Sequence, residues 1–258
     1  MPYMGALNRR AFLVAAGAGV GVAVLGGGSA EAVALVPSVP SVPPVVTWEL
    51  VGGFVGPGFA SLRAPRLVAY PDGLAIADAG RQLRLDRAGL SELRRHLATV
   101  LADPASTRRR PDVPVIADAP AARFMVRAAN RRVYTAEVDG LDESREQHAY
   151  PQRLYRLSDH LSRVHHRVTT HGSPFDPAAV RLVAVVDTTS PSPTAVPWPR
   201  GIPVPAIARD AFVGQIDLRG AAARTVKRSI PHRTMWPEYR IGDGRLLRVA
   251  WRLLLPHE

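Results

Sequence analysis

The stretch "RLVAYPDGLAIADAGRQLRLDRAGLSELRRHLATVL", residues 66–101, contains the two patterns that decide the fold class. Its first part predicts a hairpin, because the turn sequence Pro-Asp-Gly at 71–73 separates two short apolar runs. Its second part predicts a helix over 86–101, because Leu recurs at intervals of three and four residues and Asp86 can cap the N-terminus. A hairpin followed by a helix, without the strand–helix–strand repeat of a parallel sheet, indicates an α+β protein.

The rest of the chain continues this alternation of short strands and single helices. Further strands are predicted at 46–51, 123–128, 132–139, 180–186, 213–219 and 245–255, and a second amphipathic helix at 151–168. Residues 187–205 are rich in Pro and are predicted to be irregular. We therefore expect a two-layer α+β fold, with a mainly antiparallel sheet and two amphipathic helices packed on one side. Trp48 and Trp251 fall in predicted strands and are expected in the core.

The N-terminus has the three parts of a secretory signal: a basic start, an uncharged run over 11–30 and small-x-small sites within 30–34. The alternative is an uncleaved membrane anchor at 11–30, which its many Gly and Ala residues disfavour. The sequence "RRAFL" also resembles the twin-arginine export signal through its positions Arg9, Arg10, Phe12 and Leu13. That resemblance implies the twin-arginine export machinery as a partner, and an extracellular or cell-envelope location.

Composition divides the chain into three parts. Residues 1–34 are the predicted export signal, and "LVPSVPSVPP" at 35–44 is a Pro-rich spacer, which favours extended backbone. Residues 45–258 form the globular α+β region. The pattern also allows a division of this region into parts 45–170 and 171–258.

Charge and cysteine content exclude several classes of function. The chain has no Cys, which excludes disulfides, thiolate metal sites and thiol nucleophiles. Its formal charge is +11, yet Lys227 is its one lysine and no run of five basic residues occurs. Nucleic-acid recognition signatures are also absent, so we expect no nucleic-acid partner. Arg-rich faces could instead bind an anionic cell-wall polymer through salt-sensitive contacts.

Catalytic and metal-binding motifs are not found. The sequence contains no G-x-S-x-G, no P-loop and no H-E-x-x-H. Five of the eight His residues fall between 148 and 171, but the pairs within the predicted helix lack the spacing of a helix-borne metal site, so we expect solvated His, no metal and no cofactor. A hydrolase whose site joins distant residues, such as Asp139, Glu143 and His160, remains an alternative.

Two stretches are candidates for binding another molecule. "GGFVG" at 52–56 could lie as extended backbone in a protease cleft, with Phe54 in an apolar pocket; alternatively its glycines form a β-bulge and Phe54 lies in the core. "PWPRGIPVP" at 197–205 could present Trp198 to a sugar or peptide, or could be an ordered Pro-rich loop lying across the domain.

Residues 46–168 resemble a known family of inhibitors. "LVGGFVGPG", the hairpin, the Leu-rich helix and "DAPAARFMVRAANRRVYTAEVDG" are similar to the emfourin-type inhibitors of thermolysin-like metalloproteases. Four positions match the Gly-rich opening strand of that family: Gly52, Gly53, Phe54 and Gly56. A later strand is matched by Asp118, Phe124 and Val126, although Asp118 lies further from Phe124 than in the family pattern. Residues 169–258 have no counterpart in that family.

Together these features predict an exported, non-enzymatic protein that binds another secreted protein, in the specific form of a protease inhibitor. The first alternative is a cell-envelope-binding or structural protein held by its Arg-rich faces. The second is the hydrolase with an unrecognised site.

Overall fold

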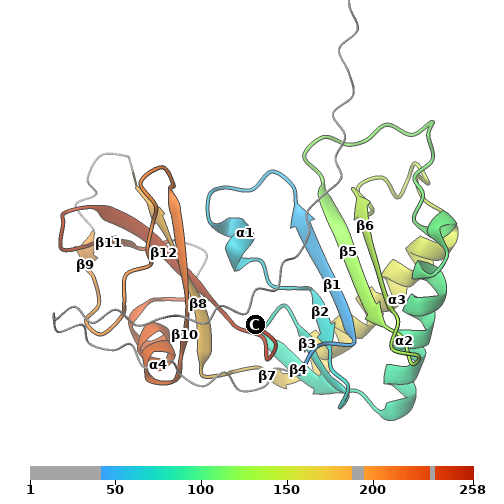
Figure 1. The fold of residues 1–258 in the computed structure, drawn as a ribbon, viewed down its shortest axis with the longest axis horizontal. Coiled ribbons are helices and arrows are strands. Elements are labelled where there is room, and N and C mark those ends of the chain that lie inside the picture. Colours follow the sequence, from blue (N-terminus) through green and yellow to red (C-terminus); the bar gives the residue numbers. More distant parts are fainter. Residues whose placement is uncertain (1–41, 188–194, 233–235) are drawn as a thin grey trace, which may run out of the picture. The chain divides into compact units, whose positions relative to one another are not determined.

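The strands in the described part of the chain form two sheets (Figure 1). The computed structural model describes residues 42–187, 195–232 and 236–258, all within one compact unit. The predicted export signal, with Arg9, Arg10, Phe12 and Leu13, lies outside the described residues, as does most of the spacer. Within the part of the chain that is described, no helix is long and apolar enough to cross a membrane.

The first sheet has seven strands, and every neighbouring pair is antiparallel. In spatial order they are β6 (Val133–Asp139), β5 (Pro120–Arg127), β1 (Val46–Gly52), β2 (Leu67–Ala69), β3 (Leu74–Ala77), β4 (Arg81–Arg84) and β7 (Ser173–Pro174). Trp48 on β1 lies opposite Phe124 on β5 and Leu67 on β2, and all three side chains are buried. This register places large apolar side chains side by side on one face of the sheet.

Two amphipathic helices cover that face, α2 (Arg87–Leu101) and α3 (Gln152–His171). The side chain of Asp86 caps α2 by accepting a 2.7 Å hydrogen bond from the Gly89 N–H. Leu85 and Leu90, on either side of this cap, are buried in the same core, which is the arrangement of a hydrophobic staple. The cap and the staple explain why α2 begins where it does. A 3₁₀ turn, Pro104–Ser106, follows α2.

The opposite face of the first sheet has a polar part, over β1, β5 and β6, and an apolar part, over β2 and β3. Over β1, β5 and β6 it carries an ion-paired row in which Arg123 contacts Glu49 at 3.2 Å and Glu137 at 2.9 Å. Over β2 and β3 it carries Val68 and Ile76, which are fully buried. Strands β2 and β3 are therefore covered on both faces.

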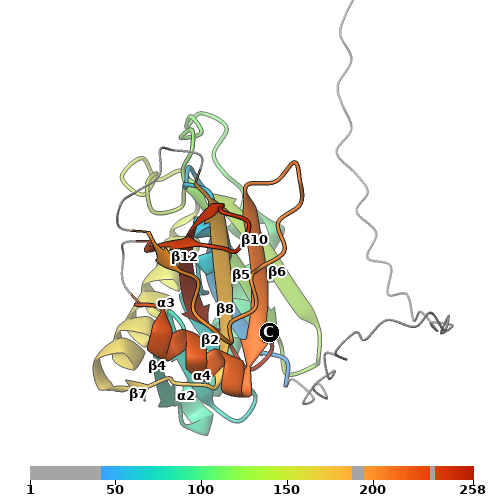
Figure 2. The ribbon, with the colours of Figure 1, turned by 90° about the vertical axis from the view of Figure 1, so that its left-hand side faces the viewer.

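The second sheet has five strands. In spatial order they are β10 (Val213–Arg219), β8 (Ala179–Val186), β12 (Leu246–Leu253), β11 (Glu238–Arg240) and β9 (Val196–Pro197). Only the pair of β11 and β9 is parallel among these. Helix α4 (Gly220–Ser229) packs against β8 and β10 (Figure 2). Its buried residues Ala223 and Val226 join an apolar core that includes Leu182 and Val249.

The residues after β12 join the two sheets. Leu255 packs with Phe175 against Val68 and Ile76 of the first sheet. Beside this apolar contact, Arg252 forms two hydrogen bonds to the carboxylate of Glu258, at 2.6 and 2.7 Å. We call this interaction the Arg252–Glu258 pair.

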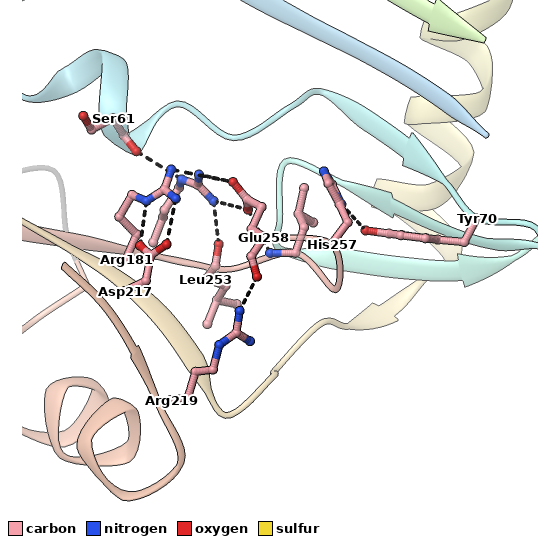
Figure 3. A network of polar contacts seen from close by, with 10 residues as sticks. Ser61, Tyr70, Arg181, Asp217, Arg219, Leu253, His257 and Glu258 are labelled. Atoms are coloured by element: carbon pink, nitrogen blue, oxygen red, sulfur yellow. Dashed lines mark hydrogen bonds and ion pairs between the residues drawn. The ribbon is translucent and has the colours of Figure 1, made fainter. Parts of the chain in front are cut away.

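Further polar contacts surround the Arg252–Glu258 pair (Figure 3). Arg252 also donates to the carbonyl of Ser61 at 3.2 Å, and Ser61 belongs to α1 (Phe59–Leu62), in the connection from β1 to β2. Arg181 lies 3.7 Å from the Glu258 carboxylate and is itself paired with Asp217. The pair therefore links the last strand of the second sheet to a connection of the first sheet.

The predicted α+β class with mainly antiparallel strands is confirmed. The helix expected at 86–101 is α2, capped by Asp86 as predicted, and the helix expected at 151–168 is α3, which continues to His171. Trp48 and Trp251 are buried as expected. The arrangement of one sheet with both helices on one side describes only the first sheet, because the remaining strands form a sheet of their own. Helix α4 was not predicted, since its ten residues bury only Ala223 and Val226.

We predict that Glu258→Gln lowers the free energy of unfolding by about 2 kcal/mol at neutral pH, because it leaves the buried Arg252 without its counter-charge. Burial alone would raise the pKa of the Glu258 carboxyl, but hydrogen bonds from Arg252 and the Leu255 N–H outweigh it and lower that pKa. Because this pKa is lower in the folded protein, the ionised Glu258 carboxylate stabilises the fold at pH values above 4.5, the ordinary pKa of a Glu side chain. This stabilisation is lost as the pH falls through the pKa of Glu258 in the folded protein.

Denaturant unfolding of the two proteins over a pH series checks this prediction. The difference in unfolding free energy should be full at neutral pH and should shrink below about pH 4. Glu137→Gln is the matched control, because Glu137 is paired with Arg123 on an exposed face and its loss should cost less than about 1 kcal/mol. Equal effects of the two substitutions would contradict the role given to Glu258.

Candidate binding loop

The loop that follows β1 is anchored at its base by two hydrogen bonds. Gly52 and Gly53 have φ values of +63° and +77°, a conformation that favours Gly, and they direct the chain away from the sheet. The Phe54 N–H then donates to the carbonyl of Asp118 at 3.1 Å. The Arg63 side chain donates to the carbonyl of Gly52 at 2.9 Å. The two ends of the loop are therefore held together.

The far end of the loop rests on the second sheet. The Phe59 N–H donates to the carbonyl of Gly56 at 3.2 Å, which forms the turn that begins α1. Gly58 has a φ of +81°, and a Cβ atom there would lie 2.8 Å from both Trp236 and Val185. Only Gly permits so close an approach, so the turn is fixed against this face of the second sheet.

Between these two anchors the loop exposes apolar side chains. Phe54 is 88 % exposed, the highest value among the large apolar residues of the described ranges, and Val55 and Phe59 are 36 % and 48 % exposed. The hypothesis that Phe54 lies in the core is therefore wrong. Gly53 and Gly56, on either side of Phe54 and Val55, have no side chains that could cover the Phe54 ring.

An aromatic groove of about 800 Å³ lies beside the loop. The Phe59 ring lies 5.2 Å from Trp236, and the His232 ring lies 4.3 Å from Trp251, measured between ring centroids. The Leu253 and Arg252 side chains also line the groove. Sites of this size with aromatic walls and few polar groups are typical of ligand and side-chain pockets.

A second groove, of about 570 Å³, lies on the face of the first sheet opposite α2 and α3. Its lining includes Glu49, Arg123 and Arg252, whose charges are paired with neighbouring side chains. His257 also lines it, and burial lowers the pKa of this imidazole, whose Nδ1 lies 2.8 Å from the Tyr70 hydroxyl. Burial correspondingly raises the pKa of Tyr70. The charged groups here hold one another, so this groove offers few charges to a ligand.

The structure brings the four candidate residues at 52–56 together but places Trp198 elsewhere. The Trp198 Nε1–H donates to the carbonyl of Ile202 at 2.7 Å, and its half-buried ring lies edge-on to Tyr239 at 5.8 Å. It packs against the core that contains Leu182, whereas Gly58 faces Val183. Alternate residues of a strand point to opposite faces, so Trp198 and the loop lie on opposite faces of the second sheet. This geometry fits the ordered Pro-rich loop, so we leave Trp198 out of the binding surface.

The residues of the hydrolase alternative have other neighbours. His160 is half-buried on α3 and its ring lies 5.1 Å from that of His96 on α2, so it is not the solvated side chain that we expected. Asp139 ends β6 and Glu143 lies in the turn that follows. Within the described ranges, none of the interactions of His160 involves either carboxylate. Among the described residues, no group of His, Asp and Glu is arranged to hold a metal ion.

Phe59 and Trp236 also belong to this surface, although the sequence did not single them out. Phe59 follows Pro57-Gly58, and an apolar residue in a Gly- and Pro-rich stretch is a signal that could have singled it out. Trp236 is distant in sequence and gave no such signal. No protein family model, no curated protein and no solved structure matches this chain.

We predict that Gly53→Ala destabilises the protein more than Gly52→Ala. Both residues have positive φ, which costs about 1 kcal/mol for Ala. A Cβ on Gly53 would also lie 3.3 Å from the Pro120 backbone, whereas one on Gly52 would have no atom within 4 Å. We expect losses of about 2 and about 1 kcal/mol in denaturant unfolding. Equal losses would show that the base of the loop is not packed against Pro120.

Proposed function

We propose that this chain is an exported, non-enzymatic protein that binds another exported protein through the loop 53–59, and that it acts as a protease inhibitor. The observation that carries this proposal is the almost complete exposure of Phe54 on a loop that is anchored at both ends. An exposed aromatic side chain is costly to leave in water and is typical of the anchor residues at the centre of protein interfaces.

The anchoring of the loop favours tight binding. Hydrogen bonds at Gly52, Phe54 and Phe59 fix the loop before any partner arrives. A loop that is already ordered loses little conformational entropy on association, so more of the contact energy appears as affinity. The neighbouring aromatic groove would extend the apolar contact beyond Phe54.

The free backbone of the loop supports a protease as the partner. Within the described residues, the C=O of Phe54 and both backbone groups of Val55 form no hydrogen bond. A partner that draws this segment into an extended conformation could pair with its free N–H and C=O groups, as the strand-like edge of a protease cleft does, while Phe54 enters an apolar pocket. The resemblance of 46–168 to the emfourin-type inhibitors suggests a thermolysin-like metalloprotease as the first enzyme to test.

We predict that the purified protein abolishes the peptidase activity of a thermolysin-like protease at a stoichiometric ratio, and that Phe54→Ala weakens this inhibition at least about 30-fold, the loss of about 2 kcal/mol expected of an interface anchor. Residual activity against a small peptide substrate measures both. Phe54→Ala should leave the unfolding free energy within about 0.5 kcal/mol, because the ring is exposed.

Phe212→Ala is the matched control, because Phe212 is 61 % exposed but lies on the connection before β10. It should inhibit as well as the unchanged protein. A flat titration, with the chain intact afterwards, would remove this protease class as the partner. Equal weakening by both substitutions would show that the loop is not the contact surface.

A further inference from the structure

The two helices of the first sheet form a small groove on their solvent side, at a distance in sequence from the binding loop. It has a volume of about 250 Å³. Helix α2 contributes Gly89 and Glu92, and helix α3 contributes His160, Arg163 and Arg167. Residues three and four apart lie on one face of a helix, so each helix presents these side chains along a single stripe.

The positive charge of this groove is poorly compensated. Arg163 and Arg167 are exposed, and neither forms an ion pair with a carboxylate among the described residues. By contrast, two other arginines, one on α3 and one shortly before it, form ion pairs. Arg153 contacts Asp103 at 2.6 Å, and Arg145 contacts Asp159 at 2.8 Å. Glu92 is the one carboxylate that lines the groove.

One histidine, His160, lines the groove, and its ring packs against a second histidine, His96. The rings of His96 on α2 and His160 on α3 meet edge to face, with centroids 5.1 Å apart and planes at 77°. Both side chains are half-buried. Their charged forms would repel each other unless an anion lay between the helices.

We propose that this groove binds a phosphate group, held by the guanidinium groups of Arg163 and Arg167 and by the imidazole of His160. The planar fork of a guanidinium donates two parallel hydrogen bonds to a phosphate, and two arginines one helical turn apart can grip adjacent oxygens. The volume lies below the roughly 300–1,000 Å³ of sites that enclose a drug-sized molecule, which suits a single phosphate group, either free or carried on a polymer.

The histidines make this binding dependent on pH. Burial lowers the pKa of His160, and the charges of His96, Arg163 and Arg167 lower it further, against the opposing effect of Glu92. Burial also lowers the pKa of His96; Glu92 opposes this shift, and Arg163 and Arg95 add to it. Both imidazoles are therefore neutral at neutral pH. A bound dianion stabilises their protonated forms, so binding takes up protons and strengthens as the pH falls.

Calorimetric titration of the full protein with tripolyphosphate at constant low ionic strength tests the site. We expect the double variant Arg163→Gln/Arg167→Gln to bind at least about tenfold more weakly, because each charged hydrogen bond contributes more than 1 kcal/mol. The control Arg156→Gln/Arg224→Gln removes the same charge from exposed arginines outside the groove and should change affinity less than about twofold. Equal losses in both variants, or no binding by the unchanged protein, would overturn the proposal.

A second titration, with sulfate, tests the histidines, because the charge of sulfate stays constant over the range used. Affinity should rise as the pH falls below the ordinary histidine pKa of 6.5, and this rise should disappear in His96→Gln/His160→Gln. The control His166→Gln/His171→Gln changes two exposed histidines of the same helix and should keep the rise. An unchanged pH profile in the first variant would remove His96 and His160 from the site.

A titration with inorganic phosphate in place of tripolyphosphate distinguishes a free anion from a phosphate carried on a polymer. A polymer should bind more tightly, through its neighbouring phosphates. The groove shares no residue with loop 53–59, so either proposal can fail alone.

Discussion

The ion pair between Arg252 and Glu258 is the interaction on which the arrangement of the two sheets depends. Arg252 is only 7 % exposed, and it reaches from β12 both to the Glu258 carboxylate and to the carbonyl of Ser61. A guanidinium buried to this extent is stable only where its charge and its donors are satisfied. The pair therefore holds the last strand, the segment that follows it and the connection from β1 to β2 in one place (Figure 3).

This constraint extends to the candidate binding surface. Ser61 lies in α1, two residues after Phe59, so the bond from Arg252 fixes the far end of the same loop that exposes Phe54. The hydrogen bond from the Phe54 N–H to the carbonyl of Asp118 holds the near end. An ordered loop between two such anchors can hold an aromatic ring in water without losing its conformation. The unfavourable free energy of exposing this ring to water would be removed if a partner covered it.

Local sequence patterns predicted most of the helices and strands of this fold. The division of the strands into two sheets and the exposure of individual side chains depend on tertiary contacts, which these patterns do not contain. The Leu spacing and Asp86 were sufficient to place α2, and the turn at 71–73 placed its hairpin. The division into two sheets depends on the pairing of β8 with β10 and β12, which are distant in sequence. The Gly-rich stretch indicated the candidate binding loop, but whether Phe54 is buried or exposed could not be decided without the fold. The contact between Phe59 and Trp236 and the contact between His96 and His160 each involve residues far apart in sequence. No local sequence pattern could therefore predict them.

The central claim is that the Arg252–Glu258 pair orders the loop that carries Phe54. Amide hydrogen exchange of residues 59–63 tests it most directly, because the Phe59 and Arg63 amides are hydrogen-bonded only when the turn and α1 are formed. We predict slow exchange in the unchanged protein and faster exchange in Glu258→Gln, under conditions in which both proteins stay folded. Equal protection of these amides in the two proteins would contradict it, since the loop would then be ordered without the pair.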